Sequence, residues 1–431
     1  NSIDPVYLGD SIEELKNAKA ILLIGSVLRE EQPLIAHRIR QAVLHSNTQL
    51  NVISIMSEDL LCKVDNQVTC DCREVAYFLA QVVKASGDCG AIDLSEVAVS
   101  DRAMAIAKSM MENNGYIILG EVAKSLPNYS EILCLVQQLS KNIQGKFGVL
   151  SGRANEAGAK IVGCVPYKGA FNQTIAAKGM NVDQMLTNSL KSYILFNTEL
   201  EQDAYNSQKA LSALGAAQTV MVISAFVNDK MKEYADVILP ITPYTETAGS
   251  YINMFGKWQT FNGVTKPLGS AKPGWKVLRV LANQLGINEF QYNSIEDIRA
   301  EIKPEINDIK LFANSPNASE IPFKVVKPDL NGLIRFGIQG PYAVDSITRR
   351  AGSLQETYYA KLPILSISPQ LADKLGVVKD QVVIVAQGEV KGEFNVAICK
   401  NVPENVVIFA VNEQTNGFAG RYDAIEVRIC S

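Results

Sequence analysis

The chain has 431 residues, enough for roughly three domains, and 47% of them are apolar while 20% are charged, which favours large buried cores over disorder. Lys and Arg total 41 against 45 Asp and Glu, and the net charge of −4 argues against non-specific binding to nucleic acid or to an anionic membrane. No apolar run reaches the length of about 18 residues that a membrane-spanning helix needs, so we expect no direct membrane insertion.

The chain start, NSIDPVYLGD, has no basic segment followed by an apolar one, so we expect no signal peptide. It also lacks an initiator Met, which indicates either processing or a piece of a longer polypeptide. Eight cysteines in a long chain without a secretory signal are expected to be reduced thiols in the cytoplasm.

The first third of the chain alternates strands and helices. Residues 20–25 form a short apolar run typical of a strand buried on both faces, Pro33 opens a predicted helix, and residues 51–56 form the next strand. This β-α-β unit predicts a parallel sheet with right-handed crossovers. Further helices are expected at 73–84, 101–113 and 129–143, further strands at 115–120 and 147–151, and a loop at 152–158.

The alternation pauses at 167–190 and resumes with strands at 192–196, 219–224 and 237–239. A strong helix is expected at 276–285, ended by Gly286. Residues 291–361, rich in Pro and Asn, are predicted to be a connector with one short helix at 295–302. From residue 362 the pattern changes to short strands separated by Gly-containing turns, which predicts a small β-barrel.

The fold class is therefore predicted to be α/β, with parallel-sheet domains followed by a small C-terminal β-barrel. The expected domains are an α/β domain at 1–190, a second α/β segment at 191–290, the connector at 291–361 and the barrel-like domain at 362–431.

The stretch from Ala235 to Phe261 links the α/β part to the rest of the chain. It leaves a strand at Pro240, passes through a polar loop, and turns at Asn253 and Gly256. In this loop Glu246 is the best candidate for an acid or base, although a loop carboxylate that accepts backbone N–H bonds is the interpretation we favour.

Other chemistry has weaker support. No phosphate-binding glycine motif follows any strand, although the loops at the carboxyl edge of an α/β sheet can still hold a ligand. The pair Cys70 and Cys72, with Cys62 and Cys89 nearby, lacks the spacing of an iron–sulfur site. The two histidines, His37 and His45, lie on one predicted helix, too far apart to share a metal by themselves.

Three more residues are candidates for chemistry or binding. Cys164 is a possible nucleophile with no histidine near it in sequence. Arg153 and Asn155 follow a strand and are placed to touch a partner or an anion, with solvated loop residues as the favoured alternative.

The stretch from 235 to 261 resembles the C-terminal part of the G subunit of bacterial NADH:quinone oxidoreductase (respiratory complex I). The resemblance covers nearly the whole chain. Its segments are 29–33 (REEQP), 38–42 (RIRQA), 224–231 (SAFVNDKM), 234–240 (YADVILP), 245–253 (TETAGSYIN), 273–279 (PGWKVLR) and 342–350 (YAVDSITRR), with Gly256 and Trp258-Gln259 between them.

That family shares its fold with molybdopterin oxidoreductases, so the resemblance implies Rossmann-like sheets of the formate dehydrogenase type and a C-terminal barrel. Segments 368–376 (SPQLADKLG) and 417–423 (GFAGRYD) are similar to the last domain of that superfamily.

Two departures from the G-subunit pattern stand out. The cysteine motifs that bind iron–sulfur clusters in the family's N-terminal region are missing, so we expect no cofactor in this chain and clusters only in the absent N-terminal part. Phe255-Gly256-Lys257 stands where the family commonly has Glu-Gly-Arg, and a lysine there cannot make a bidentate contact.

The resemblance implies a structural and docking region of the peripheral-arm G subunit, supporting NADH-to-quinone electron transfer without its own redox centre. Its expected partners are other peripheral-arm subunits on the cytoplasmic side of the inner membrane. We expect no catalytic, cofactor-binding or metal-binding residue, and a structural motif of Glu246, Gly249, Asn253, Gly256 and Lys257. The alternatives are a fragment of an active molybdopterin-dependent oxidoreductase, such as a formate dehydrogenase relative, and a free-standing α/β module that binds a small molecule.

Overall fold

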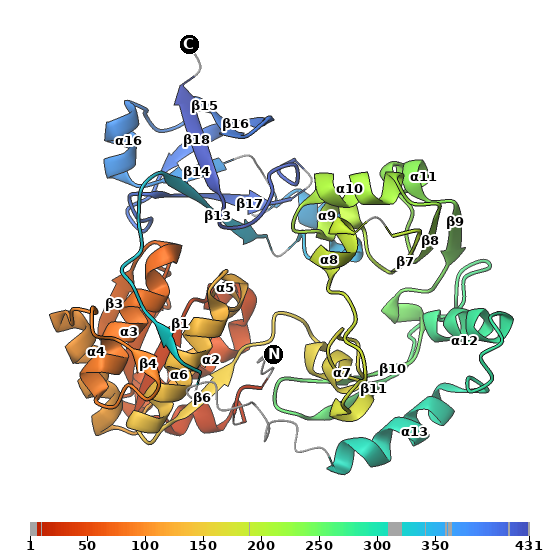
Figure 1. Ribbon diagram of the computed structural model, residues 1–431, viewed down its shortest axis with the longest axis horizontal. Helices are drawn as coiled ribbons and strands as arrows, with labels where there is room; N and C mark the ends of the chain where they lie inside the picture. The colour runs from red at the N-terminus through yellow and green to blue at the C-terminus, as the bar shows by residue number, and fades with distance from the viewer. Residues whose placement is uncertain are drawn as a thin grey trace.

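The computed structural model describes residues 7–9, 11–188, 190–308, 321–340, 342–357, 360, 364–412 and 414–429. Two α/β units and a β-barrel make up most of this part of the chain (Figure 1). The predicted fold class, parallel α/β sheets followed by a barrel, is confirmed. None of the helices in the described ranges combines the length and apolarity that a bilayer crossing requires.

The first unit is built on a five-stranded parallel sheet in the order β3-β2-β1-β5-β6. Its central strand is buried on both faces, as its five consecutive apolar residues predict. The strands are β1 (Ala20–Ile24), β2 (Gln49–Ser54), β3 (Asn66–Thr69), β5 (Tyr116–Leu119) and β6 (Lys146–Val149).

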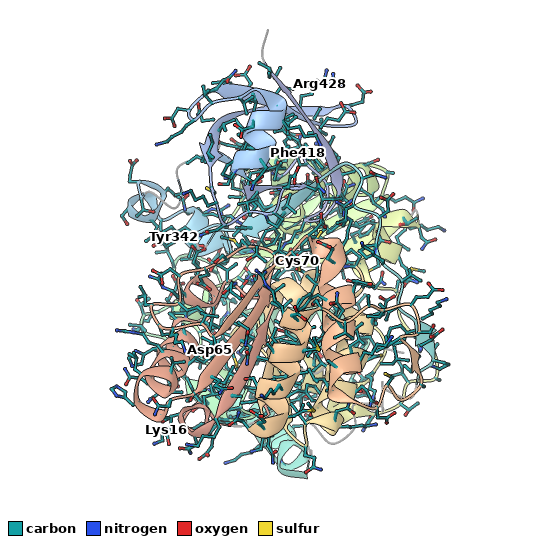
Figure 2. The ribbon with its side chains drawn as sticks, turned by 90° about the vertical axis from the view of Figure 1, so that its left-hand side faces the viewer. Lys16, Asp65, Cys70, Tyr342, Phe418 and Arg428 are labelled. Atoms are coloured by element: carbon teal, nitrogen blue, oxygen red, sulfur yellow. The ribbon has the colours of Figure 1, made fainter. Side chains whose placement is uncertain are left out.

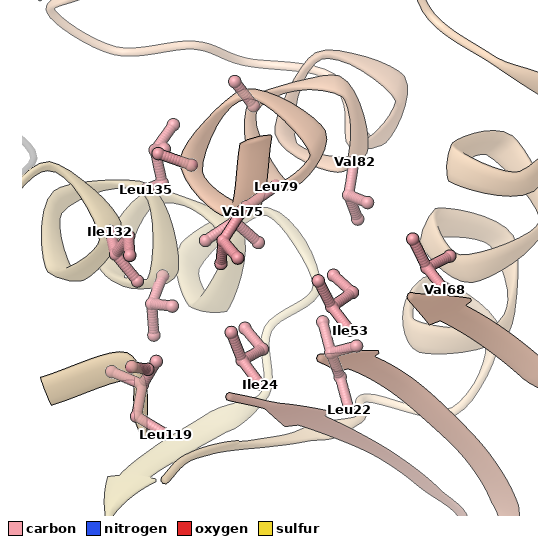
Figure 3. Close-up of a cluster of buried hydrophobic side chains, with 14 of the residues drawn as sticks. Leu22, Ile24, Ile53, Val68, Val75, Leu79, Val82, Leu119, Ile132 and Leu135 are labelled. Atoms are coloured by element: carbon pink, nitrogen blue, oxygen red, sulfur yellow. The ribbon is translucent and has the colours of Figure 1, made fainter. Parts of the chain in front are cut away.

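Helices cover both faces of this sheet. One face carries α2 (Pro33–Ser46), whose Ile35 and Ile39 pack with the strand residues Ile21 and Leu23. The helices on the other face are α3 (Val75–Ser86), α4 (Asp101–Glu112) and α6 (Tyr129–Asn142). Figure 3 shows side chains of α3 and α6 meeting Leu22, Ile24 and Ile53 of the sheet. Burial of these aliphatic side chains stabilises the unit by about 1.5–3 kcal/mol per fully buried residue.

The second unit has a three-stranded parallel sheet in the order β7-β8-β9. Its strands are β7 (Ser192–Phe196), β8 (Thr219–Ser224) and β9 (Val237–Pro240), and its helices are α8 (Val182–Thr187), α9 (Leu200–Asp203), α10 (Ser207–Gly215) and α11 (Asp229–Tyr234). Residues of α8, α10 and α11 pack on one face of the sheet, where Tyr193 and Leu195 are buried. Ile194 and Phe196 alternate with them and remain exposed on the other face.

An antiparallel hairpin of β10 (Gly249–Ile252) and β11 (Trp258–Phe261) follows the second sheet. It lies between α7 (Glu156–Ile161) and α13 (Ile295–Asp308), and Ile252 is buried there. Two differences from the sequence predictions occur here: the loop predicted at 152–158 already contains the start of α7, and the short helix predicted at 295–302 continues to Asp308. After the hairpin in the chain comes α12 (Gly274–Gln284), whose first residue lies against Phe196 of β7.

The barrel is closed by six strands in the order β13-β17-β14-β16-β15-β18. They are β13 (Leu333–Gln339), β14 (Ile364–Ile367), β15 (Val382–Gln387), β16 (Val390–Ile398), β17 (Val406–Val411) and β18 (Ala424–Ile429), and α16 (Pro369–Leu375) lies between β14 and β15. Its core contains the three mutually packed rings of Phe394, Phe409 and Phe418.

Strand β13 falls inside the stretch predicted as a connector, so the barrel begins earlier than its strand pattern indicated. The reason is visible in the strand itself. Leu333 and Arg335 point into the barrel, while Phe336 packs on the core of the first unit, so the strand is buried on both faces and carries a polar residue inside. Alternation of apolar and polar residues is therefore lost. The proposed domain boundaries remain predictions.

Candidate functional site at the junction of the sheets and the barrel

Two adjoining cavities lie where the carboxyl ends of the strands of both α/β units meet the barrel. Their volumes are about 470 Å³ and 380 Å³. Both are lined by Arg153, Gln339, Val344, Asp345 and Arg421, so they form one crevice. Figure 2 shows Tyr342 and Cys70 at the level between the first unit, marked by Asp65, and the barrel, marked by Arg428. Ligands of open α/β sheets bind at the carboxyl ends of strands, so this crevice is the first candidate for a site.

The smaller cavity is lined by the carboxyl groups of Glu30, Glu31 and Glu121, which follow strands β1 and β5. Oε2 of Glu31 accepts hydrogen bonds from Oγ of Ser26 at 3.1 Å and from the backbone N–H of Val27 at 3.2 Å. Burial nevertheless raises the pKa of Glu31 to about 7, and the nearby carboxylates of Glu121 and Glu58 contribute to the rise. A carboxyl that titrates near neutrality in a crevice is a feature of functional sites.

The larger cavity is bordered by an ion-pair cluster that holds residues 342–350 against the second unit. Glu199 is buried, and its two carboxylate oxygens accept from Arg349 at 2.8 Å and Arg350 at 2.5 Å. A second N–H of Arg349 donates to Asp203 at 2.5 Å. Asp345 caps the short helix α14 (Ser346–Arg349) by accepting from two backbone N–H groups at 2.8 Å. The cluster therefore neutralises its own charges and fixes this segment over the cavity.

A buried arginine lies behind the same wall. Arg335 is 1% exposed and donates from Nη1 to the carbonyls of Phe418 and Gly420, each at 3.0 Å. Its guanidinium lies 4.2 Å from the ring centre of Phe409. Burial lowers its pKa to about 10, and Asp423 opposes that effect. The contacts are internal to the barrel, so Arg335 belongs to its core.

The residues of the crevice do not fit the cofactor that the resemblance to molybdopterin oxidoreductases implies. An enzyme with that cofactor needs a Cys or Ser metal ligand and loops rich in Arg and Lys. Among the described lining residues there are two arginines, no lysine and no cysteine, and Ser224 and Ser346 line the larger cavity. Glu199 and Asp203 are neutralised by Arg349 and Arg350. The other lining carboxylates still outnumber the two arginines; they are Glu30, Glu31, Glu121 and Asp345. The balance disfavours a large anion.

The five residues of the predicted structural motif all lie in or beside the β10–β11 hairpin, outside the crevice. Oδ1 of Asn253 accepts from the backbone N–H of Phe255 and of Lys257, both at 3.0 Å. Gly256 has a positive φ of 76°, which lets the turn close. These contacts hold a tight turn, and they leave the side chain of Lys257 exposed.

The remaining members of the motif act at the base of the hairpin. A Cβ on Gly249 would lie 2.4 Å from the ring of Phe261, so the strand pair requires glycine there. The carboxylate of Glu246 accepts from the backbone N–H of Leu268 at 3.1 Å. Phe255, where the family commonly has Glu, is half-buried against the apolar cluster of the first unit. An apolar residue therefore suits this contact.

The sulfur atoms considered for metal binding lie in apolar surroundings. Cys70 and Cys72 are buried, and burial raises the pKa of the Cys72 thiol to about 12 and that of the Cys70 thiol further. Within the described ranges, no three His, Cys, Asp or Glu side chains are grouped so that they could hold a metal ion. His37 and His45 are exposed on α2.

The other residues that the sequence analysis considered for chemistry or binding lie at different places in the structure. Arg153 lines both cavities and lies 3.5 Å from Oε1 of Gln339. Asn155 instead accepts from the backbone N–H of Ile252 at 2.9 Å and joins the hairpin to α7, while Cys164 is exposed. Glu31, the last residue of the short helix α1 (Leu28–Glu31), is absent from the sequence candidates. The sequence feature that could have identified Glu31 is its position shortly after strand β1 and Gly25, at the carboxyl edge of the sheet.

Comparison with known proteins identifies a family whose pattern this chain matches. The family described as "Molybdopterin oxidoreductase" matches residues 3–284. A formate dehydrogenase subunit alpha from Methanocaldococcus jannaschii is 26% identical over 364 residues, which cover 68% of this chain and 51% of that protein. The G subunit of NADH-quinone oxidoreductase from Mycobacterium bovis is 22% identical over 407 residues, which cover 88% of this chain and 47% of that protein. The chain thus spans about half the length of these relatives.

Among solved structures, acetylene hydratase from Pelobacter acetylenicus superimposes with a TM-score of 0.67. The match covers 96% of this chain and 78% of that chain at 12% sequence identity. At this identity the likeness concerns the fold alone.

Proposed function

The chain belongs to the molybdopterin oxidoreductase family, and on that premise we propose that it is a docking region of a G-type subunit of NADH:quinone oxidoreductase. In this proposal it supports NADH-to-quinone electron transfer structurally, without a redox centre of its own. Its partners are other peripheral-arm subunits, on the cytoplasmic side of the inner membrane. In this proposal the clusters and the electron transfer belong to other parts of the full subunit, outside the residues of this chain.

The composition of the crevice carries the proposal. Outside the neutral Glu199 cluster, four carboxylates and two arginines line it, and no thiol is among its described lining residues. The Glu199 cluster fixes residues 342–350 along its wall. A site for a metal-bound, phosphate-bearing pterin would need the opposite charge balance. The similarity to the G subunit from Mycobacterium bovis supports assigning the chain to that type of subunit.

Metal analysis and an absorption spectrum of the purified protein test this proposal. We expect a colourless protein without molybdenum, tungsten or iron, and without pterin fluorescence. Stoichiometric molybdenum or tungsten, or bound pterin, would overturn it. Iron with a brown colour would instead assign a cluster to Cys62, Cys70, Cys72 and Cys89.

The second candidate is a part of an active molybdopterin-dependent oxidoreductase. It is favoured by the 26% identity to a formate dehydrogenase subunit and by Glu31, whose carboxyl is able to hold a proton near neutral pH. In that case Glu31 would be the group to exchange a proton with a substrate in the smaller cavity. The same metal analysis distinguishes the two candidates.

A further inference from the structure

Helix α12 leaves apolar side chains exposed to solvent: Leu278, Val280 and, at its end, Leu285. Leu278 and Leu285 are spaced to share one side of the helix, with the half-buried Leu281 between them. Leu285 is 67% exposed and Leu278 is 41% exposed, and Ala282 is the only buried residue of the helix. A surface helix of an isolated protein normally buries this stripe.

Two polar side chains of α12 lie partly against the protein. Arg279 and Asn283, one turn apart, each keep a side-chain atom buried without a hydrogen-bond partner in the described part of the chain: Nε of Arg279 and Oδ1 of Asn283. Burying such atoms unpaired costs about 1–3 kcal/mol each. The helix is held in this orientation by its start, where Gly274 packs directly against the ring of Phe196. A partner that covers the leucines would offset the cost.

The chain segment that contains α12 carries one sign of charge. Residues 247–288 contain no Asp or Glu, while the whole chain has 45 of them. Five cations lie in the same segment: Lys257, Lys266, Lys272, Lys276 and Arg279. None of these five forms an ion pair within the described ranges, whereas Lys230 and Lys232 of α11 both pair with carboxylates of their own helix. Lys272 and Lys276, just before and within α12, are exposed, so their charge is available to a second molecule.

The apolar surface continues beyond the helix. The exposed face of the three-stranded sheet, with Ile194 and Phe196, joins α12 through the contact between Phe196 and Gly274. Figure 1 shows α12 at the outer edge of the molecule, on the side away from the first α/β unit and the barrel. An apolar centre with a charged rim is the arrangement of protein–protein interfaces.

From these observations we infer that the outward side of α12, with Leu278 and Leu285 and the rim of Lys272 and Lys276, docks a partner protein. The partner presents an apolar patch ringed by Asp and Glu. This inference rests on the proposed docking function and locates its surface. An anionic membrane is the less suitable occupant, because α12 has only 11 residues and Val277 and Leu281 are already half-buried.

The probe for the test is a subcomplex of the other peripheral-arm subunits, purified without this chain and titrated with the full subunit. Leu285→Ser should weaken binding about tenfold, since it removes a leucine from the interface. The matched control is Leu34→Ser on α2, where Leu34 is 73% exposed. Lys272→Glu with Lys276→Glu should slow association at low salt, and Lys230→Glu with Lys232→Glu on α11 should not. Circular dichroism checks that each variant is folded.

The outcomes separate the inference from the function it rests on. Binding that is weakened by the α12 variants and not by the controls supports the inference. Binding that none of these variants changes overturns the docking surface and leaves the proposed function standing. A wild-type subunit that does not bind the subcomplex at all overturns both. If the wild type binds vesicles that contain phosphatidylserine and the α12 variants do not, the surface is a membrane-binding surface. That result also overturns the inference.

Discussion

Replacing Glu31 by Gln tests the physical description of the crevice, because this carboxyl is buried beside two other carboxylates. The pKa of Glu31 rises from 4.5 to about 7 through burial, with contributions from Glu121 and Glu58. A rise of this size corresponds to roughly 3 kcal/mol, and partial contact with water reduces the expected effect to about 2 kcal/mol. The substituted glutamine keeps an oxygen that accepts from Ser26 and Val27, and it never ionises.

Proton binding by the folded and the unfolded chain determines which of the two proteins, wild type or Glu31→Gln, is the more stable at a given pH. Below pH 4.5 the carboxyl is protonated in both the folded and the unfolded chain, so the wild type and Glu31→Gln should differ little. Between pH 4.5 and about 7 the unfolded chain loses this proton before the folded one does, so the stability contributed by the raised pKa falls as the pH rises. At pH 8 the variant should therefore be the more stable protein by about 2 kcal/mol.

Guanidinium unfolding, followed by circular dichroism from pH 5 to pH 8, measures this difference. The control is Glu112→Gln on α4, an exposed residue 3.8 Å from Lys108, for which we expect a change below about 0.5 kcal/mol at every pH. A variant that is less stable than the wild type at pH 8, or a difference that does not change with pH, would refute the reasoning about burial.

Three further predictions rest on packing and burial. Glu199→Gln should lower the free energy of unfolding by about 3 kcal/mol, because it leaves Arg349 and Arg350 without their shared carboxylate. Limited proteolysis of the variant should then cut within 342–357. A variant as resistant to the protease as the wild type would contradict the ion-pair account. Phe255→Glu should lower the urea midpoint by an amount equivalent to about 1–3 kcal/mol, because Phe255 packs on the first unit, and an unchanged midpoint would show that the position is merely tolerant. At pH 8 a thiol reagent should modify the exposed Cys164 quickly, and it should modify the buried Cys70 and Cys72 only after the protein unfolds. Rapid modification of either buried thiol in the native protein would contradict their raised pKa values.

Local sequence pattern is sufficient to predict an element whose residues are all apolar and all buried. Strand β1 is apolar at all five positions and is buried on both faces, so its prediction needs no tertiary information. Strand β13 escapes prediction because Arg335 occupies an interior position. Nothing in the local sequence indicates that the carbonyls of Phe418 and Gly420, more than 80 residues away, will accept from it.

The crevice can be predicted only in part for a similar reason. Arg153 is recognisable as a residue placed after a strand, but Glu31, Glu199 and Arg421 come together only when two sheets and a barrel meet. The hairpin motif shows the same limit on a smaller scale. Asn253 bonds to neighbours two and four residues away, whereas Glu246 reaches Leu268, which local turn chemistry does not specify.

The central claim is that the crevice takes no part in the chemistry while the chain supports assembly of the complex. The most direct test is the NADH-to-quinone rate per assembled complex, measured with the full-length subunit carrying Glu31→Gln together with Arg153→Gln. The account predicts the same rate per complex as the wild type. A fall of roughly a hundredfold or more, with assembly unchanged, would show that the crevice is catalytic and would contradict it.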